Sequence, residues 1–255
     1  MNHASSHLNP LIVLLQTTIP NLFIHCFSSA PYYMKTKYFW SFDGTNEVQE
    51  KNPNVDYILG VLDNGVRLSN HNEISTPWLD LGVTNLSCIS EPYTCPEGFT
   101  ILFWTRMNGR QENKIVINAA EQEFARGVYL RINRGKLRFS TTGLEDEEIF
   151  PRTVQRFLDA EWHFDTWTHV GLVWNAKTKE MKIYYNCSEA EYTAAGVTLD
   201  RSAHVFGSPS RLIVGANNEL SNNAEIEIDE LGIWDAVLAE GAICYVFNSR
   251  RGRIY

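Results

Sequence analysis

The sequence predicts an all-β protein, an antiparallel sandwich of two sheets with one short helix near its C-terminal end. Short runs of β-branched and aromatic residues recur along the chain, and Gly, Asn and Pro separate them. Several of these runs alternate apolar with polar residues, which is typical of strands that bury one face. The length of 255 residues is within the range of one large β-sandwich.

Neighbouring runs are expected to pair as hairpins. Residues 127–133 and 136–140 flank the turn dipeptide Arg134-Gly135, and both runs alternate apolar with polar positions. Residues 167–174 and 180–185 form a second such pair across a polar turn. The other expected strands are 99–106, 114–118, 211–215 and 225–234.

Two further segments are expected to be something other than strands. Residues 236–247 place Val237, Ile243 and Phe247 at helical spacing, which predicts the short C-terminal helix. Residues 144–165 are first acidic and then aromatic, and we interpret them as a long surface loop.

The first thirty residues differ from the rest of the chain. An apolar stretch begins at Leu11, is interrupted at Pro20 and ends in small residues at Ala30, and no charged side chain other than His precedes Lys35. A membrane span needs about 20 apolar residues, so a cleaved signal peptide over residues 1–30 fits better. A membrane anchor and an ordinary buried segment are the alternatives. The simplest partition then gives one domain, residues 36–255.

The cysteines support an extracellular location. The chain has five, and removal of the leader takes Cys26 and leaves an even number. Pro92 favours a turn between two of the remaining four, and elimination pairs the other two. The predicted disulfides are Cys88–Cys95 and Cys187–Cys244. The alternative is four buried free thiols.

Charge and sequons bear on the partners. The formal net charge of −8 argues against nucleic acid, because there is no excess of Lys and Arg to replace counterions. Asn85 and Asn186 each begin an Asn-X-Ser sequon, so both are candidate glycosylation sites in a secreted protein.

Several segments together resemble the laminin-G-like and pentraxin domains. Trp167-Thr-His-Val-Gly-Leu-Val-Trp-Asn175 is similar to their "W-x-H-V-x-x-x-W" strand, and residues 181–186 are similar to the strand that follows it. Residues 228–238 resemble the family's "IDEvriwdraLs" ending. Residues 99–104 and 78–82 resemble two earlier strands.

This resemblance implies a concanavalin A-like jelly roll, and a binding or adhesion module whose ligand is a glycan or an extracellular protein. It leaves self-association into a homo-oligomer, and a purely structural place in a larger ectodomain, as alternatives.

The chain departs from true pentraxins at two places. Gly171 and Leu102 stand where pentraxins carry a bonded pair of Cys. Pentraxins also bind calcium through an acidic run, of which this chain keeps only part. The candidate ligands for a single calcium ion are Asn217, Asn218, Glu219 and Asp229. The alternative is a polar turn, with Asp229 hydrogen-bonded to backbone at the base of a loop.

A catalytic interpretation depends on Glu225, Glu227 and Asp229. Alternate residues of a strand share one face, and concanavalin-like glucanases use such a row of carboxylates for retaining hydrolysis. The order of residue types here differs from that of the glucanases. We therefore expect no enzymatic activity, and Glu225 and Glu227 are candidate ligand contacts or part of a solvated sheet surface.

The aromatic residues divide into two groups. Trp104, Trp174 and Trp234 each lie in an apolar run and are expected to pack between the sheets. Trp162 lies beside acidic residues, and it is either an exposed ligand contact or a cover for a sheet edge. His169 lies within a predicted strand, and we interpret it as structural.

Overall fold

The structure of the protein is a computed structural model. It describes residues 36–44, 50–51, 55–69, 77–83, 87–90, 92, 95–119, 127–145, 152–162, 165–199, 211–217 and 219–250. The predicted signal peptide, Asn85 and Asn218 lie outside these residues. Neither of the two described helices is long and apolar enough to cross a membrane.

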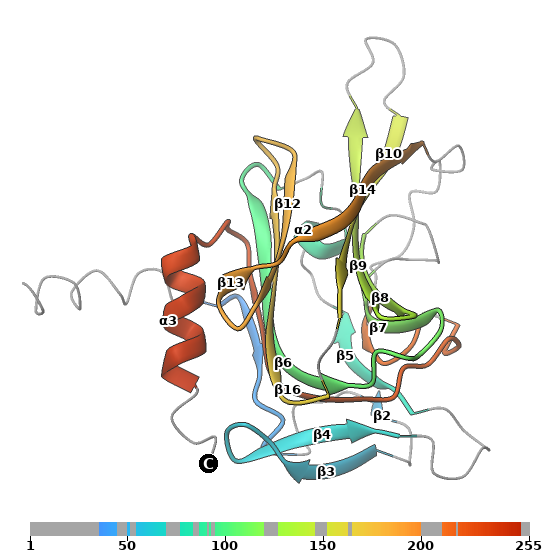
Figure 1. The fold of residues 1–255 in the computed structure, drawn as a ribbon, viewed down its shortest axis with the longest axis vertical. Helices are drawn as coiled ribbons and strands as arrows, with labels where there is room; N and C mark the ends of the chain where they lie inside the picture. The colour runs from blue at the N-terminus through green and yellow to red at the C-terminus, as the bar shows by residue number, and fades with distance from the viewer. Residues whose placement is uncertain are drawn as a thin grey trace, which may run out of the picture. The chain divides into compact units, whose positions relative to one another are not determined.

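The described residues form two eight-stranded antiparallel sheets that pack face to face (Figure 1). Sheet A runs in the order β13 (Ser188–Glu189), β12 (Glu180–Tyr185), β11 (Thr168–Asn175), β6 (Gly98–Met107), β16 (Ile226–Trp234), β4 (Asn64–Leu68) and β3 (Val55–Leu59), and β1 (Tyr38–Trp40) also pairs with β16. Sheet B runs in the order β14 (Tyr192–Leu199), β10 (Arg152–Glu161), β9 (Lys136–Glu145), β8 (Val128–Asn133), β7 (Lys114–Asn118), β15 (Arg211–Val214), β5 (Leu79–Val83) and β2 (Glu50–Lys51). The helices are α2 (Ser87–Ser90) and α3 (Glu240–Arg250). This arrangement confirms the predicted fold class.

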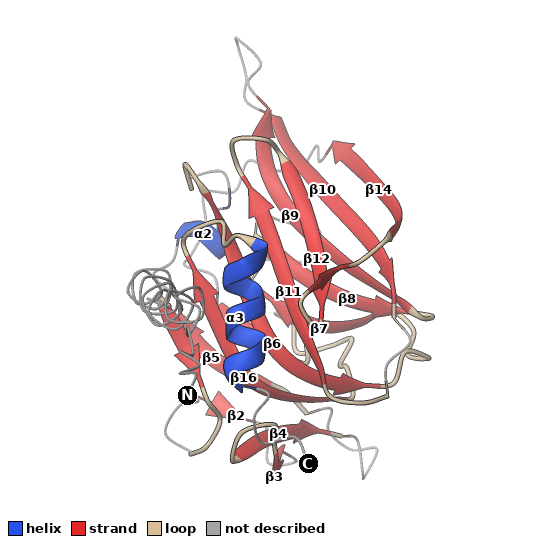
Figure 2. Cartoon of the chain, turned by 60° about the vertical axis from the view of Figure 1, so that its left-hand side comes forward, coloured by secondary structure: helices blue, strands red, loops and turns tan. Residues whose placement is uncertain are grey.

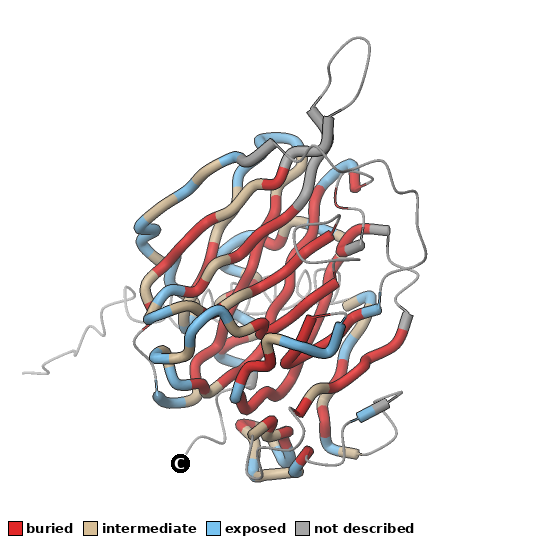
Figure 3. Tube along the Cα trace, turned by 90° about the vertical axis from the view of Figure 1, so that its right-hand side faces the viewer, coloured by how far each residue is buried: buried red, intermediate tan, exposed pale blue. Residues whose placement is uncertain are grey.

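The main core lies between the inner faces of the two sheets. On β6 the residues Phe99, Ile101 and Phe103 point inward and are completely or almost completely buried. The alternate residues of the same strand point to the outer face of sheet A, where Leu102 and Trp104 are also buried. Burial on both faces explains why this strand reads as a nearly continuous apolar run. Figure 3 shows that the buried residues concentrate in the middle of the strands.

Helix α3 covers part of the outer face of sheet A (Figure 2). Ile243 packs there with Leu102 and Trp234, and Phe247 packs with Trp104. Gly171 and Leu102 are direct cross-strand partners. A Cβ at Gly171 would lie 3.1 Å from the Leu102 side chain and 3.6 Å from Ile243. The position that a disulfide takes in pentraxins is therefore filled here by Leu102 and the helix.

The predicted tryptophan burial is confirmed, but the predicted packing holds for one of the three. Trp174 belongs to the core between the sheets, while Trp104 and Trp234 lie on the outer face beside α3. Trp104 stacks on Phe247 with ring centroids 5.5 Å apart. The sequence could not distinguish the two locations, because both faces of sheet A are apolar near the helix.

The first predicted hairpin is confirmed by its turn. Arg134 and Gly135 both have positive φ, 52° and 79°, between the paired residues Asn133 and Lys136. Positive φ at both central residues is the conformation whose twist matches antiparallel strands.

The prediction of a surface loop over residues 144–165 is wrong for most of that segment. β9 extends to Glu145, and β10 occupies Arg152–Glu161. On β10, Leu158 and Ala160 point into the core, while Asp159 points outward and forms a two-bonded ion pair with Arg138 at 2.6 Å. Arg138 is the direct cross-strand partner of Asp159 and balances its charge, so the carboxylate can lie within a buried strand.

The helix begins later than predicted, at Glu240 instead of residue 236. Thr100 explains the difference, because its hydroxyl donates to the carbonyl of Ala236 at 2.8 Å and accepts from the N–H of Leu238 at 3.0 Å. These bonds hold residues 236–238 against β6 in a non-helical conformation.

Candidate functional site

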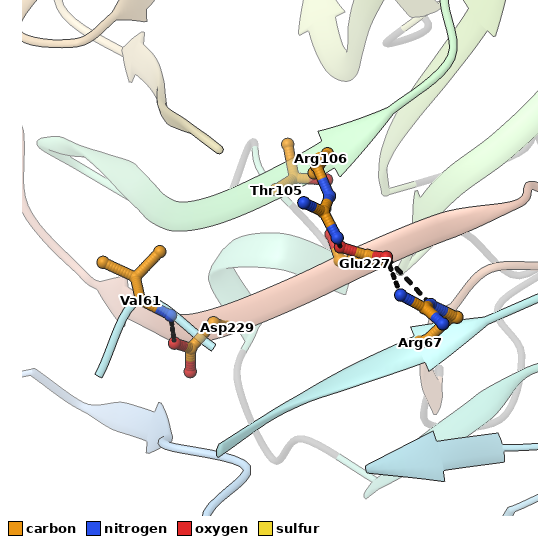
Figure 4. A network of polar contacts seen from close by, with 6 residues as sticks. All are labelled: Val61, Arg67, Thr105, Arg106, Glu227 and Asp229. Atoms are coloured by element: carbon orange, nitrogen blue, oxygen red, sulfur yellow. Dashed lines mark hydrogen bonds and ion pairs between the residues drawn. The ribbon is translucent and has the colours of Figure 1, made fainter. Parts of the chain in front are cut away.

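The three carboxylates predicted to share a face separate in the structure. Glu227 and Asp229 lie on the outer side of β16, while Glu225 precedes the strand and is exposed. The backbone of Glu225 exchanges two hydrogen bonds of 2.8 Å with the side chain of Gln111. Figure 4 shows Glu227 and Asp229 directed to different partners.

Glu227 is an ion-pair centre. Arg67 lies 2.8 Å from one of its carboxylate oxygens, and Arg106 lies 2.5 Å from the other. Only 11% of the Glu227 side chain is exposed, whereas the two arginines keep 37% and 38%. Arg106 also lies over the ring of Trp167 at 5.6 Å. The Glu227 carboxylate is thus largely occupied within sheet A, which leaves it little capacity to contact a ligand.

Asp229 fixes the turn between β3 and β4. Its Oδ2 accepts hydrogen bonds from the N–H groups of Val61 at 2.8 Å and Leu62 at 3.1 Å. A Cβ at Gly60 would lie 2.5 Å from the same oxygen, so the turn needs glycine there. Burial raises the pKa of Asp229 to about 6, although the backbone N–H donors oppose this shift. This arrangement matches the alternative in which Asp229 is hydrogen-bonded to backbone at a loop base.

Two described members of the predicted calcium set, Asn217 and Asp229, already accept hydrogen bonds within the protein. Asn217 uses its side-chain oxygen within its own turn, accepting from the N–H groups of Glu219 at 3.0 Å and Ser221 at 2.8 Å. Asp229 is engaged as described above. Among the described residues, no three His, Cys, Asp or Glu side chains are grouped so that they could hold a metal ion.

Trp162 is not an exposed contact residue. Its side chain is buried, and its indole N–H donates to the carbonyl of Met107 at 3.1 Å. The ring meets Tyr185 edge to face, with centroids 5.5 Å apart. Of the two alternatives, an exposed contact and a cover for a sheet edge, the first is therefore ruled out. Trp162 belongs to the main core, where its indole N–H has a backbone acceptor.

Both predicted disulfides are present. Cys88 bonds Cys95 within a short loop, and Cys187 bonds Cys244. The second disulfide joins the end of β12 to α3. Asn186 is exposed, and its side-chain oxygen accepts from the N–H of His169 at 2.9 Å. Glycosylation at this residue stays a prediction.

A cleft that the sequence did not indicate lies at the open edge of the sandwich. It has a volume of about 540 Å³ and is lined by β10 and β14 of sheet B and by β12 and β13 of sheet A. Leu158, Met181 and Val197 contribute apolar surface. Lys182 and Glu189 lie on its polar side and form an ion pair at 2.7 Å.

The cleft exposes apolar side chains of β14. Tyr192 and Val197 are 65% and 51% exposed. Each lies opposite a residue of β10 on the inner side of sheet B, as the pairs Tyr192–Ala160 and Val197–Arg156 show. Residues on this side would be buried if the sheets met along their whole length. The sequence signal was the uncharged run 192–199, which lay between the predicted strands.

Residues 81–244 match the family described as the concanavalin A-like lectin/glucanases superfamily. No curated protein sequence matches the chain significantly.

Solved structures with a similar fold include binding domains of botulinum neurotoxins. The serotype D binding domain has 17% identity and a TM-score of 0.53, over 78% of this chain. The binding domain of neurotoxin DC in complex with rat synaptotagmin II has 14% identity and a TM-score of 0.55, over 80%. The same domain in complex with SialylT has 15% identity and a TM-score of 0.53, over 80%. The chain spans 46% of each of these proteins, and the likeness concerns the fold.

Proposed function

The chain belongs to the concanavalin A-like lectin/glucanases superfamily, and from this premise we propose that it is an extracellular module that binds a glycan in the cleft beside β14. Solved structures of similar fold include the binding domain of botulinum neurotoxin DC, in complex with rat synaptotagmin II and with SialylT. Fold alone does not choose the ligand. The chemistry of the cleft is therefore the basis of the proposal.

The observation that carries the proposal is an open cleft that combines exposed apolar surface with charged side chains. Tyr192 offers an aromatic ring that is 65% exposed, and an amphipathic ring of this kind suits a ligand that is partly apolar and partly wet. Lys179, Lys182 and Glu189 supply hydrogen-bond donors and acceptors around it. A sugar presents C–H groups that can pack on the Tyr192 ring and hydroxyl groups that can hydrogen-bond to the charged side chains. Pockets of about 300–1,000 Å³ with few polar groups are the usual size for small ligands.

Two disulfides support the extracellular location in this proposal. Disulfides persist in oxidising compartments and are rare in the cytosol. The predicted signal peptide over residues 1–30 agrees with the same compartment.

Binding without catalysis is part of the proposal. Retaining glycosidases need two carboxyl groups about 5–5.5 Å apart, with one free to attack the sugar. Glu227 is held by Arg67 and Arg106, and Asp229 is buried under the β3–β4 turn. We therefore expect no release of sugar from a β-glucan.

The test is retention of the protein on a glycan array, followed by titration with the best glycan. Tyr192→Ala should weaken binding about tenfold, which corresponds to about 1.4 kcal/mol for one stacking contact. Tyr245→Ala is the matched control, because Tyr245 is a 41% exposed tyrosine on α3, which does not line the cleft. Retention should not change with a chelator, since Asn217 and Asp229 already use their oxygens within the protein.

Other results would contradict the proposal. Binding that survives Tyr192→Ala but is lost in Tyr245→Ala would place the ligand site elsewhere. An absence of retention on every glycan would favour a protein ligand or a structural role.

A further inference from the structure

Strand β14 forms one end of sheet B in the part of the chain that the structure describes. We infer that two copies of the chain associate by antiparallel pairing of β14 with β14, so that sheet B continues across a two-fold axis and the two clefts meet. This inference concerns a surface of the protein without ligand and does not depend on the proposed glycan. Three observations carry it: the composition of the strand, its exposed side chains and its register.

The composition of β14 differs from that of β3, β13 and β2, which also end the two sheets. Unpaired backbone groups at an end strand invite another strand, and proteins commonly block them with charged residues or proline. In the described part of the two sheets, β3 carries Asp56, β13 carries Glu189, and β2 consists of Glu50 and Lys51. Residues 192–199 contain no charged residue and no proline. Nothing in β14 therefore opposes pairing with a second strand.

The exposed apolar residues point to the same strand. Tyr192 and Val197 are both more than half exposed, and β14 is the only described strand or helix with two such large apolar side chains in solvent. A second copy paired along β14 would cover Val197, and this apolar surface would then lose contact with water.

The register follows from the pleat. Residues directly opposite each other in a sheet point to the same side, and Gly196 pairs with Phe157 of β10 on the outer side. With the axis at Gly196, Ala195 of one copy lies opposite Val197 of the other, and both point to the inner side. An axis at Ala195 would instead bring Val197 against Thr193, where a bulge interrupts the strand.

Glycine at position 196 fits a place on the axis. A Cβ there would lie 2.5 Å from the ring of Phe157, so the outer side of this residue is already covered by the chain's own aromatic ring. Two glycine backbones can approach each other without side chains between them. Ala194 and Ala195 keep the neighbouring positions small.

The expected dimer is concentration-dependent. Pairing of one strand from each copy buries less surface than a standard stable interface of about 1,600 Å². Association should therefore increase from micromolar to near-millimolar protein.

The experiment measures molar mass by light scattering or sedimentation over that range, without any glycan. The native protein should shift from monomer to dimer. Val197→Lys should remain monomeric, because it places a charge against Ala195 of the second copy. Leu59→Lys is the matched control, since Leu59 is an 83% exposed residue at the end of sheet A, and this variant should dimerise like the native protein.

A rescue variant tests the register itself. Ala195→Glu combined with Val197→Lys places opposite charges across the axis twice, so dimerisation should return. Both positions are exposed in the single chain, so the melting temperatures should stay close to that of the native protein.

Two results would overturn the inference: a native protein that is monomeric at every concentration, or a Val197→Lys variant that dimerises as well as the native chain. A monomer that still binds a glycan would leave the proposed function intact.

Discussion

Two buried titratable residues lie on the outer face of sheet A and respond to pH in opposite directions. Burial raises the pKa of Asp229 from its ordinary value of 3.8 to about 6. Burial lowers the pKa of His169 from 6.5 to about 4, because its ring packs against both Trp104 and Phe247. A buried group favours its neutral form, which is the protonated form of Asp and the deprotonated form of His.

The signs follow from proton binding in the folded and unfolded states. Between pH 4 and 6 the folded protein holds the Asp229 proton more tightly, so this residue makes stability fall as the pH rises. Between pH 6.5 and 4 the unfolded chain protonates His169 first, so this residue makes stability fall as the pH decreases. The two effects oppose each other over nearly the same range.

Replacing either residue should therefore reveal the effect of the other. In Asp229→Asn, stability should rise from pH 4 to 6.5. In His169→Leu, stability should fall from pH 4 to 6. In each variant the free energy of unfolding should change by as much as about 3 kcal/mol over this pH range, from about 1.4 kcal/mol per pKa unit. Urea unfolding at several pH values measures both slopes.

Asp165→Asn is the control for these variants, because it removes a carboxylate from an exposed position. Its stability profile should follow that of the native protein. Equal profiles in the native protein and both buried-site variants would show that neither residue is perturbed by burial.

At the scale of elements, the two disulfides constrain loops of very different length. Cys88 and Cys95 are 7 residues apart, whereas Cys187 and Cys244 are 57 residues apart. The longer loop also contains β14, β15 and β16, and it ties α3 to the end of β12.

Removing the longer connection should be the more destabilising change. From the entropy of loop closure, Cys187→Ala with Cys244→Ala should lower the free energy of unfolding by about 4 kcal/mol, and Cys88→Ala with Cys95→Ala by about 2 kcal/mol. Urea unfolding of the two double variants gives the order. A larger loss from the shorter loop would mean that native packing, and not loop entropy, dominates.

The strands that the sequence revealed are those with a clear apolar pattern. The β8–β9 hairpin, β11 with β12 and the buried β6 and β16 were predicted, because each alternates or is continuously apolar. β10 was missed because it contains a buried charged residue, Asp159. Its burial is explained only by the ion pair with Arg138 on another strand. β14 was missed because the small residues in its middle, Ala194, Ala195 and Gly196, resemble a loop.

The site was predicted less well than the fold. Glu227 and Asp229 were found as a pair of carboxylates on one side of a strand, but their tasks depend on Arg67, Arg106 and the turn at Val61, which are distant in sequence. The cleft depends on how far two sheet ends diverge. No local pattern in one strand records that distance.

At the scale of the whole molecule, the extracellular proposal predicts a defined covalent state. The secreted protein should lack residues 1–30 and should weigh less than the reduced chain by two hydrogen atoms for each of its two disulfides. Intact-mass measurement with and without reduction checks both. Treatment with a glycosidase that removes Asn-linked glycans should reveal any modification of Asn85 or Asn186.

A chain that retains residues 1–30 and has free thiols would contradict secretion. The fold and the cleft would stand, because they depend on the packing of the two sheets.

The place of β16 determines when the protein can fold during its synthesis. This strand lies inside sheet A between β6 on one side and β4 and β1 on the other, yet it is the last strand of the described chain. Tyr38 pairs with Ile233, so the sheet joins residues almost two hundred positions apart. Long-range pairing of this kind slows folding.

Until β16 leaves the ribosome, the strands on both sides of it have no partner at those edges. The hairpins of sheet B connect strands that are consecutive in sequence and can form earlier. The nascent chain therefore passes through a period in which the β7–β8–β9 hairpins of sheet B can form, while sheet A still lacks β16. During that interval the edges of β6 and β4 that later pair with β16 are open, and chaperones of the folding compartment would be expected to protect them.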